Sequence, residues 1–449
     1  MEYLIMAGQL IMSLSILIVL HEMGHFFPAR WFNTRVEKFY LFFDPGFSLF
    51  KYKRGDTEYG IGWLPLGGYV KISGMIDESM DKEQLALPAQ PWEFRSKPAW
   101  QRLIIMLGGV TVNFILGFLL FGMVLFTWGK KYLPAENAIY GIHADSLGRA
   151  LGLETGDKIL AIGDKPFDRF SDSSIKREIV INQAKTLKVN RNGEEISLPI
   201  SQDDVNMLTK RENKEERLFL PRLPFVVNNV PAKGDYPARK AGIEVNDSIV
   251  GVNGQRISYY DQYVDIAKNN KGKEISLSIV RAGKEVEKMI TLTKDGLIGV
   301  QIMPPEYFFK ISREEYSFAQ SFPAGFNEGY NLLADQIKAF GGIFAGRIKA
   351  SESLGGFGTI AGLFGGQWVW ENFWRMTAVL SLILAFMNLL PIPALDGGYV
   401  MFLMYELVSG RKPSDKFLEY ATITGFVLVL GLLLYANGLE LIAWLQDIF

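Results

Sequence analysis

The stretch "YLIMAGQLIMSLSILIVLHEMGH" (3–25) near the start of the chain determines the class of fold. Its first 18 residues, Tyr3 to Leu20, carry no charge, and His21 ends the apolar run. A helix needs about 20 mostly apolar residues to cross a hydrocarbon layer about 30 Å thick. A cleaved signal peptide would show a basic start and a small-residue cleavage site, and this stretch has neither. We therefore expect a membrane span that is retained.

Three more long uncharged stretches follow it. They cover residues 103–128, 376–395 and 420–439. Buried helices of a large soluble protein are the alternative interpretation, but four such stretches in one chain of 449 residues are hard to bury without a membrane. The sequence therefore predicts a polytopic α-helical membrane protein with four transmembrane helices.

Charge and cysteine content exclude several classes of function. The chain has 47 Lys and Arg against 48 Asp and Glu, so it lacks the basic surplus with which proteins neutralise nucleic-acid phosphates. It has no Cys, which excludes disulfide scaffolds, thiolate zinc fingers and cysteine nucleophiles. We expect no nucleic-acid partner, and we expect contact with membrane lipids along the four spans.

Lys and Arg near the span ends indicate the orientation in the membrane. They cluster in 26–102 and in the short connection 405–418, and such residues favour the cytoplasmic side. Lys130 and Lys131 dissent, but they begin a long region in which the rule counts less. We expect the region from 129 to about 370 to be extracytoplasmic, with both termini on the same outer side.

A repeat lies in the middle of the chain, where the composition becomes typical of a soluble domain. "ALGLETGDKILAIGDKPF" (150–167) aligns without gaps to "KAGIEVNDSIVGVNGQRI" (240–257), at an offset of 90 residues. Each copy is typical of a helix end, a turn that ends in Asp, a buried strand and a polar turn. A period this long predicts two small duplicated domains, since the repeats of solenoids run about 20–50 residues.

The two copies resemble tandem PDZ domains in the circularly permuted form found in bacterial proteases. The resemblance implies domains over 129–221 and 222–310 that bind extended peptides or C-termini by adding a strand to a sheet edge. Spacer domains without a ligand and a steric gate are the alternatives. His143 lies in the first copy without a partner motif, and we expect a structural role for it.

A metal-binding motif ends the first span. His21, Glu22 and His25 form His-Glu-x-x-His, and positions four apart on a helix share a face, so both imidazoles can reach one Zn²⁺. Glu22 would lie beside the metal, where a carboxylate can take a proton from a metal-bound water. Two ordinary interfacial histidines are the alternative, but ionisable residues within a span are costly and are presumed functional. The motif predicts one catalytic zinc per chain.

The third ligand must come from elsewhere in the chain, because a catalytic zinc has three protein ligands and an open position. Asp396 in "NLLPIPALDGG" (388–398) is the best candidate, since it closes the third uncharged run on the same side as the two histidines. Pro391 and Pro393 should break the helix there. Asn388 could donate a hydrogen bond to a substrate carbonyl or its oxyanion. The alternative is that Asp396 only caps the following helix.

The two motifs together resemble those of the site-2 protease family of intramembrane zinc metalloproteases. The resemblance covers essentially the whole chain, and it implies His21, His25 and Asp396 as zinc ligands. It also implies Glu22 as the catalytic base and Asn388 as a substrate-positioning residue. By the same resemblance the protein lies in a bacterial inner membrane, with its PDZ domains in the periplasm and its active site towards the cytoplasm.

A substrate class and a reaction are implied by the same resemblance. The reaction is regulated intramembrane proteolysis of a single-pass membrane protein after a first extracytoplasmic cut. The substrate would be an anti-sigma factor of the envelope stress response, with remnant signal peptides as a second possibility. A non-catalytic membrane scaffold that binds peptides through its PDZ domains is the competing interpretation, and the intact Glu22 and Asp396 count against it.

Two further segments resemble the same family. "EYGIGWLPLGGYVKISGM" (58–75) alternates apolar and polar residues about Pro-Leu-Gly-Gly and predicts a β-hairpin. In the family this segment dips into the membrane, and its edge can pair with unwound substrate. The residues expected to do so are Ile61, Trp63, Gly67, Gly68, Tyr69 and Lys71. "GGVTVNF" (108–114) places Asn113 in the second span, for a hydrogen bond between helices or for contact with substrate.

The expected fold is thus a polytopic membrane protein of four transmembrane helices, with two extracytoplasmic β-rich PDZ domains and a membrane-associated β-hairpin. The expected segments are 1–30 (first transmembrane helix, with the metal motif), 31–100 (cytoplasmic and membrane-re-entrant hairpin region), 101–128 (second transmembrane helix), 129–221 and 222–310 (the PDZ domains), 311–370 (amphipathic helices), 371–404 (third transmembrane helix), 405–418 (cytoplasmic loop) and 419–449 (fourth transmembrane helix).

Overall fold

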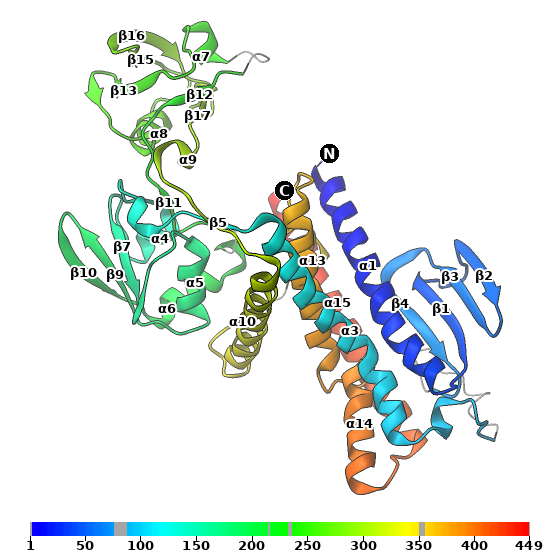
Figure 1. Cartoon of the computed structure of the whole chain (residues 1–449). Coiled ribbons are helices and arrows are strands. Elements are labelled where there is room, and N and C mark those ends of the chain that lie inside the picture. The colour runs from blue at the N-terminus through cyan, green and yellow to red at the C-terminus, as the bar shows by residue number, and fades with distance from the viewer. Residues whose placement is uncertain (1, 76–87, 214–215, 232–235, 350–354, 449) are drawn as a thin grey trace. The chain divides into compact units, whose positions relative to one another are not determined.

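The structure is a computed structural model, and it describes residues 2–75, 88–213, 216–231, 236–349 and 355–448 (Figure 1). The chain divides into two compact units. The first unit, called the membrane unit below, comprises Met1–Gly129, Glu315–Ile337 and Leu354–Phe449. The second unit, called the repeat unit, comprises Lys130–Glu314 and Lys338–Ser353.

Among the residues that the structure describes, four helices of the membrane unit are long and apolar enough to cross a membrane. They are α1 (Glu2–Trp31), α3 (Ala99–Trp128), α13 (Trp370–Leu389) and the Lys416–Ile442 part of α15 (Asp415–Ile448). The predicted polytopic membrane fold is thereby confirmed. Helix α3 is the common neighbour of α1, α13 and the shorter α14 (Asp396–Ser409). The remaining described helices of this unit are η1 (Phe94–Ser96), α12 (Phe357–Gly362) and the first part of α10 (Phe318–Phe344).

The helical path between α13 and α14 is interrupted. Helix α13 ends at Leu389, and α14 starts at Asp396. Pro391 and Pro393 lie in the interruption. They cause it, because a proline lacks the N–H that a helix needs and its ring clashes with the preceding turn. Ala394 has a φ of +82°, a left-handed value that is rare outside glycine. The tight path of this loop delivers Asp396 to the first position of a new helix.

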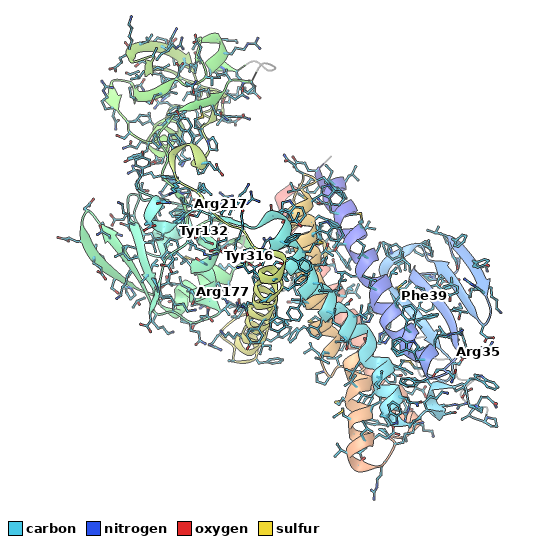
Figure 2. All side chains as sticks on the ribbon, in the orientation of Figure 1. Arg35, Phe39, Tyr132, Arg177, Arg217 and Tyr316 are labelled. Carbon is cyan, nitrogen blue, oxygen red and sulfur yellow. The ribbon has the colours of Figure 1, made fainter. Side chains whose placement is uncertain are left out.

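A four-stranded sheet packs against α1 (Figure 1). Its strands are β1 (Val36–Phe43), β2 (Phe50–Arg54), β3 (Thr57–Ile61) and β4 (Leu64–Ile72), in the order β2-β3-β1-β4. Phe39 of β1 points towards α1, where its ring lies 5.7 Å from that of Phe26 (Figure 2). Strand β4 is therefore an edge strand that runs along the helix bearing the metal motif.

The predicted hairpin over 58–75 is wrong. Strand β1 lies between β3 and β4, so these two strands do not pair, and the hairpin of this sheet is β2–β3. Gly67 and Gly68 lie within β4 and not in a turn. Their lack of a side chain allows a close approach instead, since a Cβ on Gly68 would lie 2.5 Å from Cγ2 of Ile18 on α1. Gly68 therefore marks packing of the strand against the helix, whereas a Cβ on Gly67 would lie 2.7 Å from the ring of Phe43 in β1.

The repeat unit contains two halves of the same design. The elements of the first half are β5 (Lys130–Tyr132), η2 (Ala135–Asn137), β6 (Ile142–Ala144), α4 (Ser146–Ala150), β7 (Lys158–Ile162), β8 (Lys165–Pro166), α5 (Asp172–Val180), β9 (Thr186–Arg191), β10 (Glu194–Pro199), α6 (Gln202–Thr209), η3 (Arg211–Asn213) and β11 (Phe219–Pro221). Those of the second half are β12 (Val227–Asn229), α7 (Pro237–Lys240), β13 (Ser248–Val252), β14 (Gln255–Arg256), α8 (Tyr260–Lys268), β15 (Glu274–Arg281), β16 (Lys284–Thr291), β17 (Gln301–Ile302), α9 (Pro305–Phe308) and β18 (Ser312–Glu314). The main sheets follow the same path, β10-β9-β7-β8 and β16-β15-β13-β14.

The duplication extends to one buried ion pair in each half. Nε of Arg191 donates to Asp157 at 2.8 Å, and Nε of Arg281 donates to Asp247 at 2.7 Å. Each residue of the first pair lies 90 positions before its equivalent in the second pair, which is the offset of the sequence repeat. Both aspartates are 1% exposed. Each arginine also donates to the carbonyl of the glycine that precedes the turn. The repeat is therefore a structural duplication as well as a sequence one.

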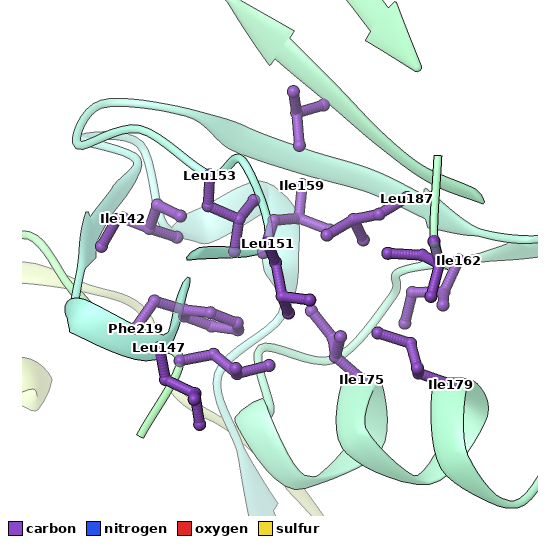
Figure 3. Close-up of a cluster of buried hydrophobic side chains, with 14 of the residues drawn as sticks. Ile142, Leu147, Leu151, Leu153, Ile159, Ile162, Ile175, Ile179, Leu187 and Phe219 are labelled. Carbon is purple, nitrogen blue, oxygen red and sulfur yellow. The ribbon is translucent and has the colours of Figure 1, made fainter. Parts of the chain in front are cut away.

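Each half has its own hydrophobic core. In the first half, Ile175 and Ile179 of α5 point towards Ile159 and Leu187 of the sheet, and all four are buried (Figure 3). The segment expected to be amphipathic, 311–370, contains α10, a helix of 27 residues. Whether this helix rests on the membrane surface stays a prediction.

Replacing Arg191 by Met should destabilise the first half locally. The carboxylate of Asp157 would remain buried without its partner, which costs about 3 kcal/mol, or roughly a hundredfold faster amide exchange in β9 and β10. Hydrogen exchange followed by mass spectrometry on the full chain measures this. Lys210→Met is the control, because Lys210 is 57% exposed and its ion pair with Glu212 contributes under about 1 kcal/mol. Equal amide exchange in the two variants would contradict a stabilising role for the Arg191–Asp157 ion pair.

Candidate active site

The last turns of α1 bring two imidazoles together. His21 and His25 are one helical turn apart, and their Nε2 atoms lie 3.2 Å from each other. The rings meet edge to face, with centroids 4.8 Å apart. Because side chains four positions apart project from one face of a helix, this convergence follows directly from the spacing in the sequence.

Asp396 completes the cluster from a distant part of the chain. Its Oδ2 lies 3.2 Å from Nε2 of His21 and 3.4 Å from Nε2 of His25. The interruption between α13 and α14 makes this possible, since Asp396 is the first residue of α14. Among the described residues, these three side chains form the group of potential ligands with the geometry to hold a metal ion.

The spacing of these atoms fits zinc. Ligand atoms about 2.0–2.2 Å from a tetrahedral zinc lie roughly 3.3–3.6 Å from one another, and the three contacts here measure 3.2, 3.2 and 3.4 Å. Three lone-pair donors this close repel each other unless a cation or a proton lies among them. The donor set of two imidazoles and one carboxylate leaves a fourth position open, as a catalytic zinc requires.

Helix α3 supports both imidazoles from behind. Nδ1 of His25 donates to the backbone carbonyl of Ile105 at 2.8 Å, and since a carbonyl can only accept, the neutral imidazole has its proton on Nδ1 and leaves Nε2 bare. One turn further along α3, a Cβ on Gly109 would overlap Nε2 of His25, so glycine leaves the room that the rings occupy. Another turn along, the amide nitrogen of Asn113 lies 3.3 Å from Nδ1 of His21. Of the two roles expected for Asn113, the structure shows the bond between helices.

Glu22 and Asn388 adjoin the cluster. The carboxylate of Glu22 accepts a hydrogen bond from the backbone N–H of Val70 in β4. The amide nitrogen of Asn388, near the end of α13, lies 3.4 Å from Nε2 of His21. Every residue of the two sequence motifs that was expected to act chemically is thus within one site.

A cavity of about 340 Å³ opens beside these groups. The cavity is lined by His21, Glu22, His25, Phe43, Gly68, Tyr69, Val70, Lys71, Ile72, Met75, Met106, Ala394, Leu395, Asp396, Tyr399 and Thr422. The edge strand β4 therefore forms one wall, and the loop before α14 forms another.

Three of the six residues expected to pair with substrate line this wall: Gly68, Tyr69 and Lys71. The hydroxyl of Tyr69 donates to Asp44 at 2.9 Å. Burial, together with this bond to Asp44, raises the pKa of Tyr69, so the hydroxyl stays neutral and keeps donating. Gly67 lies in the same strand, one position before the wall residues.

Ile61 and Trp63, the other two, are not among the residues that line the cavity. Ile61 ends β3, which is paired on one side to β1 and on the other to β2, so it has no free edge. Trp63 stacks on Phe47 with ring centroids 5.9 Å apart, and its Nε1 donates to the carbonyl of Pro45 at 3.1 Å. Trp63 lies in the bend between β3 and β4. Substrate pairing by Ile61 and Trp63 stays a prediction, and the cavity lining does not support it.

Sequence reasoning missed the contribution of α15. Thr422 lines the cavity, and one turn later a Cβ on Gly425 would overlap the backbone of Pro393 in the loop that carries Asp396. The fourth span thus packs directly on that loop. A glycine in an apolar helical run can mark a close approach. Helix α15 also carries Gly431 and Gly438, where a Cβ would meet nothing within 4 Å, so the sequence alone does not single out Gly425.

The chain was compared with known protein families and with known proteins. Residues 9–432 match the family described as peptidase family M50. The chain belongs to that family. Its membership confirms the resemblance to site-2 proteases that the two motifs predicted, and it makes the chain an M50-type peptidase.

Several known proteins match this chain along almost their whole length. A "Putative zinc metalloprotease" of Treponema pallidum (strain Nichols) is 29% identical, with 93% of this chain and 95% of the relative covered. "Regulator of sigma-E protease RseP" of Escherichia coli (strain K12) is 27% identical, with 95% and 96% covered. "Putative zinc metalloprotease NMA0084" of Neisseria meningitidis is 26% identical, with 90% and 92% covered.

Gly425→Val should weaken metal binding without changing any ligand. The added side chain would push the Pro393 loop away, and Asp396 with it, and displaced support of this kind costs about 10–100-fold in metal affinity. Zinc affinity measured against a competing chelator tests this. Gly431→Val is the matched control, since a Cβ there meets nothing within 4 Å on the same helix. The contact is unimportant if both variants bind zinc like the wild type.

Proposed function

We propose that this chain is an intramembrane zinc metalloprotease that cleaves single-pass membrane proteins during regulated intramembrane proteolysis. The observation that carries the proposal is the cluster of His21, His25 and Asp396, with ligand atoms 3.2–3.4 Å apart beside a cavity that Glu22 also lines. Membership of the M50 family and relatives with zinc metalloprotease in their names support it.

The residues divide the chemistry among them. His21, His25 and Asp396 would hold Zn²⁺, which when bound polarises a peptide carbonyl and acidifies a water. Glu22 takes the proton of the attacking water and returns it to the leaving amine, the work of a general base that becomes a general acid. Asn388 has an amide N–H near the ligand atoms, in position to donate to the oxygen that gains negative charge.

Strand β4 supplies the place for an unwound substrate. A peptide bond within a helix is shielded and hydrogen-bonded, and each unpaired backbone group in lipid costs several kcal/mol. The edge of β4 that faces α1 has a backbone donor at Val70, beside the carboxylate of Glu22. A substrate strand paired along Gly68, Tyr69 and Lys71 would recover its backbone hydrogen bonds next to the catalytic base.

The proposal includes a location in the cell, a role for the repeat unit and a substrate. The membrane is a bacterial inner membrane, with the repeat unit in the periplasm and the active site towards the cytoplasm, as the distribution of Lys and Arg favours. The two halves of the repeat unit resemble PDZ domains, which would bind a peptide or C-terminus or keep bulky substrates out. Relatives named as regulators of sigma-E support an anti-sigma factor as substrate. The scaffold alternative is not favoured, because the chemical residues are all present and gathered in one site.

Glu22→Gln should abolish cleavage while zinc stays bound. The amide keeps the shape of the side chain but cannot take a proton, and loss of such a base costs about 10²–10⁴-fold in rate. Cleavage of a single-pass reporter and zinc content per chain are measured together. The double variant His21→Ala, His25→Ala should lose both, and His143→Ala, in the repeat unit, should lose neither. Cleavage that persists in Glu22→Gln would remove Glu22 from its assigned role.

The absence of cysteine makes the orientation testable with single introduced thiols. In spheroplasts, whose inner membrane is intact, a membrane-impermeant maleimide should label Glu195→Cys, an exposed position on β10. It should label Arg411→Cys, an exposed position after α14, only once the inner membrane is opened. The opposite pattern would refute the proposed orientation.

A further inference from the structure

We propose that Asn113 is a positioning residue for the metal ligand His21. Its amide oxygen accepts the Nδ1 proton of that imidazole, which leaves Nε2 bare and aimed at the metal. The inference rests on the proposed function, since it assumes that His21, His25 and Asp396 hold zinc.

One nitrogen of His21, Nε2, faces the ligand cluster. This Nε2 lies 3.2 Å from Nε2 of His25 and 3.2 Å from Oδ2 of Asp396. Nε2 is therefore the ligand atom. A neutral imidazole that uses Nε2 as a ligand carries its proton on Nδ1, and that N–H needs an acceptor.

The acceptor for this proton is the side chain of Asn113. The amide of Asn113 is the polar group that lies beside Nδ1 of His21, with its nitrogen 3.3 Å away. Nitrogen and oxygen of a carboxamide are nearly equal in size, so a half-turn of the amide puts Oδ1 in the same place. Among the described residues no donor holds Oδ1 in its present direction, and Asn113 is 1% exposed, so bulk water does not compete. The amide is free to turn its oxygen to the imidazole.

The two histidines are supported by the same helix. Nδ1 of His25 already donates to an oxygen of α3, the carbonyl of Ile105. Ile105, Gly109 and Asn113 are spaced four apart and therefore lie on one face of α3. The helix thus meets both imidazoles along a single stripe: a backbone oxygen at one end, a glycine that makes room in the middle, and the amide at the other end. With Asn113 as an acceptor, each ligand imidazole has its outer nitrogen fixed by the same helix.

A purely structural role is the competing explanation, because buried Asn residues also join membrane helices. The same residue provides a control for it. The hydroxyl of Ser381 on α13 donates to the backbone carbonyl of Asn113 at 2.7 Å, and both residues are buried. Ser381→Ala removes a buried hydrogen bond between helices at the same place and leaves the amide beside His21 intact.

The experiment measures zinc affinity of the full-length protein by competition with a chelator, for the wild type, Asn113→Leu, Asn113→Asp and Ser381→Ala. Leu has a similar size and no acceptor, so zinc affinity should fall about 10–100-fold, as it does when an outer partner of a ligand histidine is removed. Asp keeps an acceptor oxygen and should rescue the affinity. Ser381→Ala should bind zinc like the wild type.

The results separate the possible failures. Wild-type affinity in Asn113→Leu overturns the inference, and so does equal loss in Asn113→Leu and Ser381→Ala, which would mean helix packing. Failure of Asn113→Asp to restore binding overturns it too, and this arm decides the question alone if the Leu variant does not fold. A wild type that binds no zinc would instead refute the proposed function, a result distinct from all of these.

Discussion

Mutual repulsion among three lone-pair donors is the constraint on which this structure depends. Two imidazole nitrogens and one carboxylate oxygen lie 3.2–3.4 Å apart inside a bundle of membrane helices. Ionisable groups are costly at this depth, and nothing in lipid would compensate for them. The surrounding helices and loop hold these three side chains in place. Helix α3 fixes the outer nitrogens, the interrupted third span delivers the carboxylate, and the fourth span packs on the loop between.

The interruption has its own cost and its own compensation. Ending a helix inside a membrane frees backbone N–H and C=O groups, which is tolerated only where protein or a wet cavity surrounds them. Here the freed segment forms a wall of the cavity at Ala394 and Leu395, and α15 packs on the same segment where Gly425 meets the backbone of Pro393. An unbroken span could not have done this, because its residue at position 396 would point wherever the helical period placed it.

Sequence reasoning was most successful where the determining contacts are local. The helical spacing of His21 and His25, the two prolines before Asp396 and the ungapped repeat at an offset of 90 each depend on neighbours in the chain. It failed for the sheet, because the position of β1 between β3 and β4 is a choice among non-local pairings that the alternation of residues cannot encode. Pro-Leu-Gly-Gly was misinterpreted for a related reason: glycine serves a turn and a close approach equally well, and the choice depends on Ile18, fifty positions away.

The two histidines of the cluster are held by different kinds of partner. The oxygen that holds His25 belongs to the backbone of Ile105, and a backbone oxygen is the same whatever the residue. Genetic drift at that position can replace one apolar side chain by another without disturbing the imidazole, so alignments would show nothing there. The partner of His21 is a side chain, which a single base change can delete. The contact that holds His25 therefore does not depend on which side chain stands at position 105, whereas the contact that holds His21 does depend on the side chain at position 113.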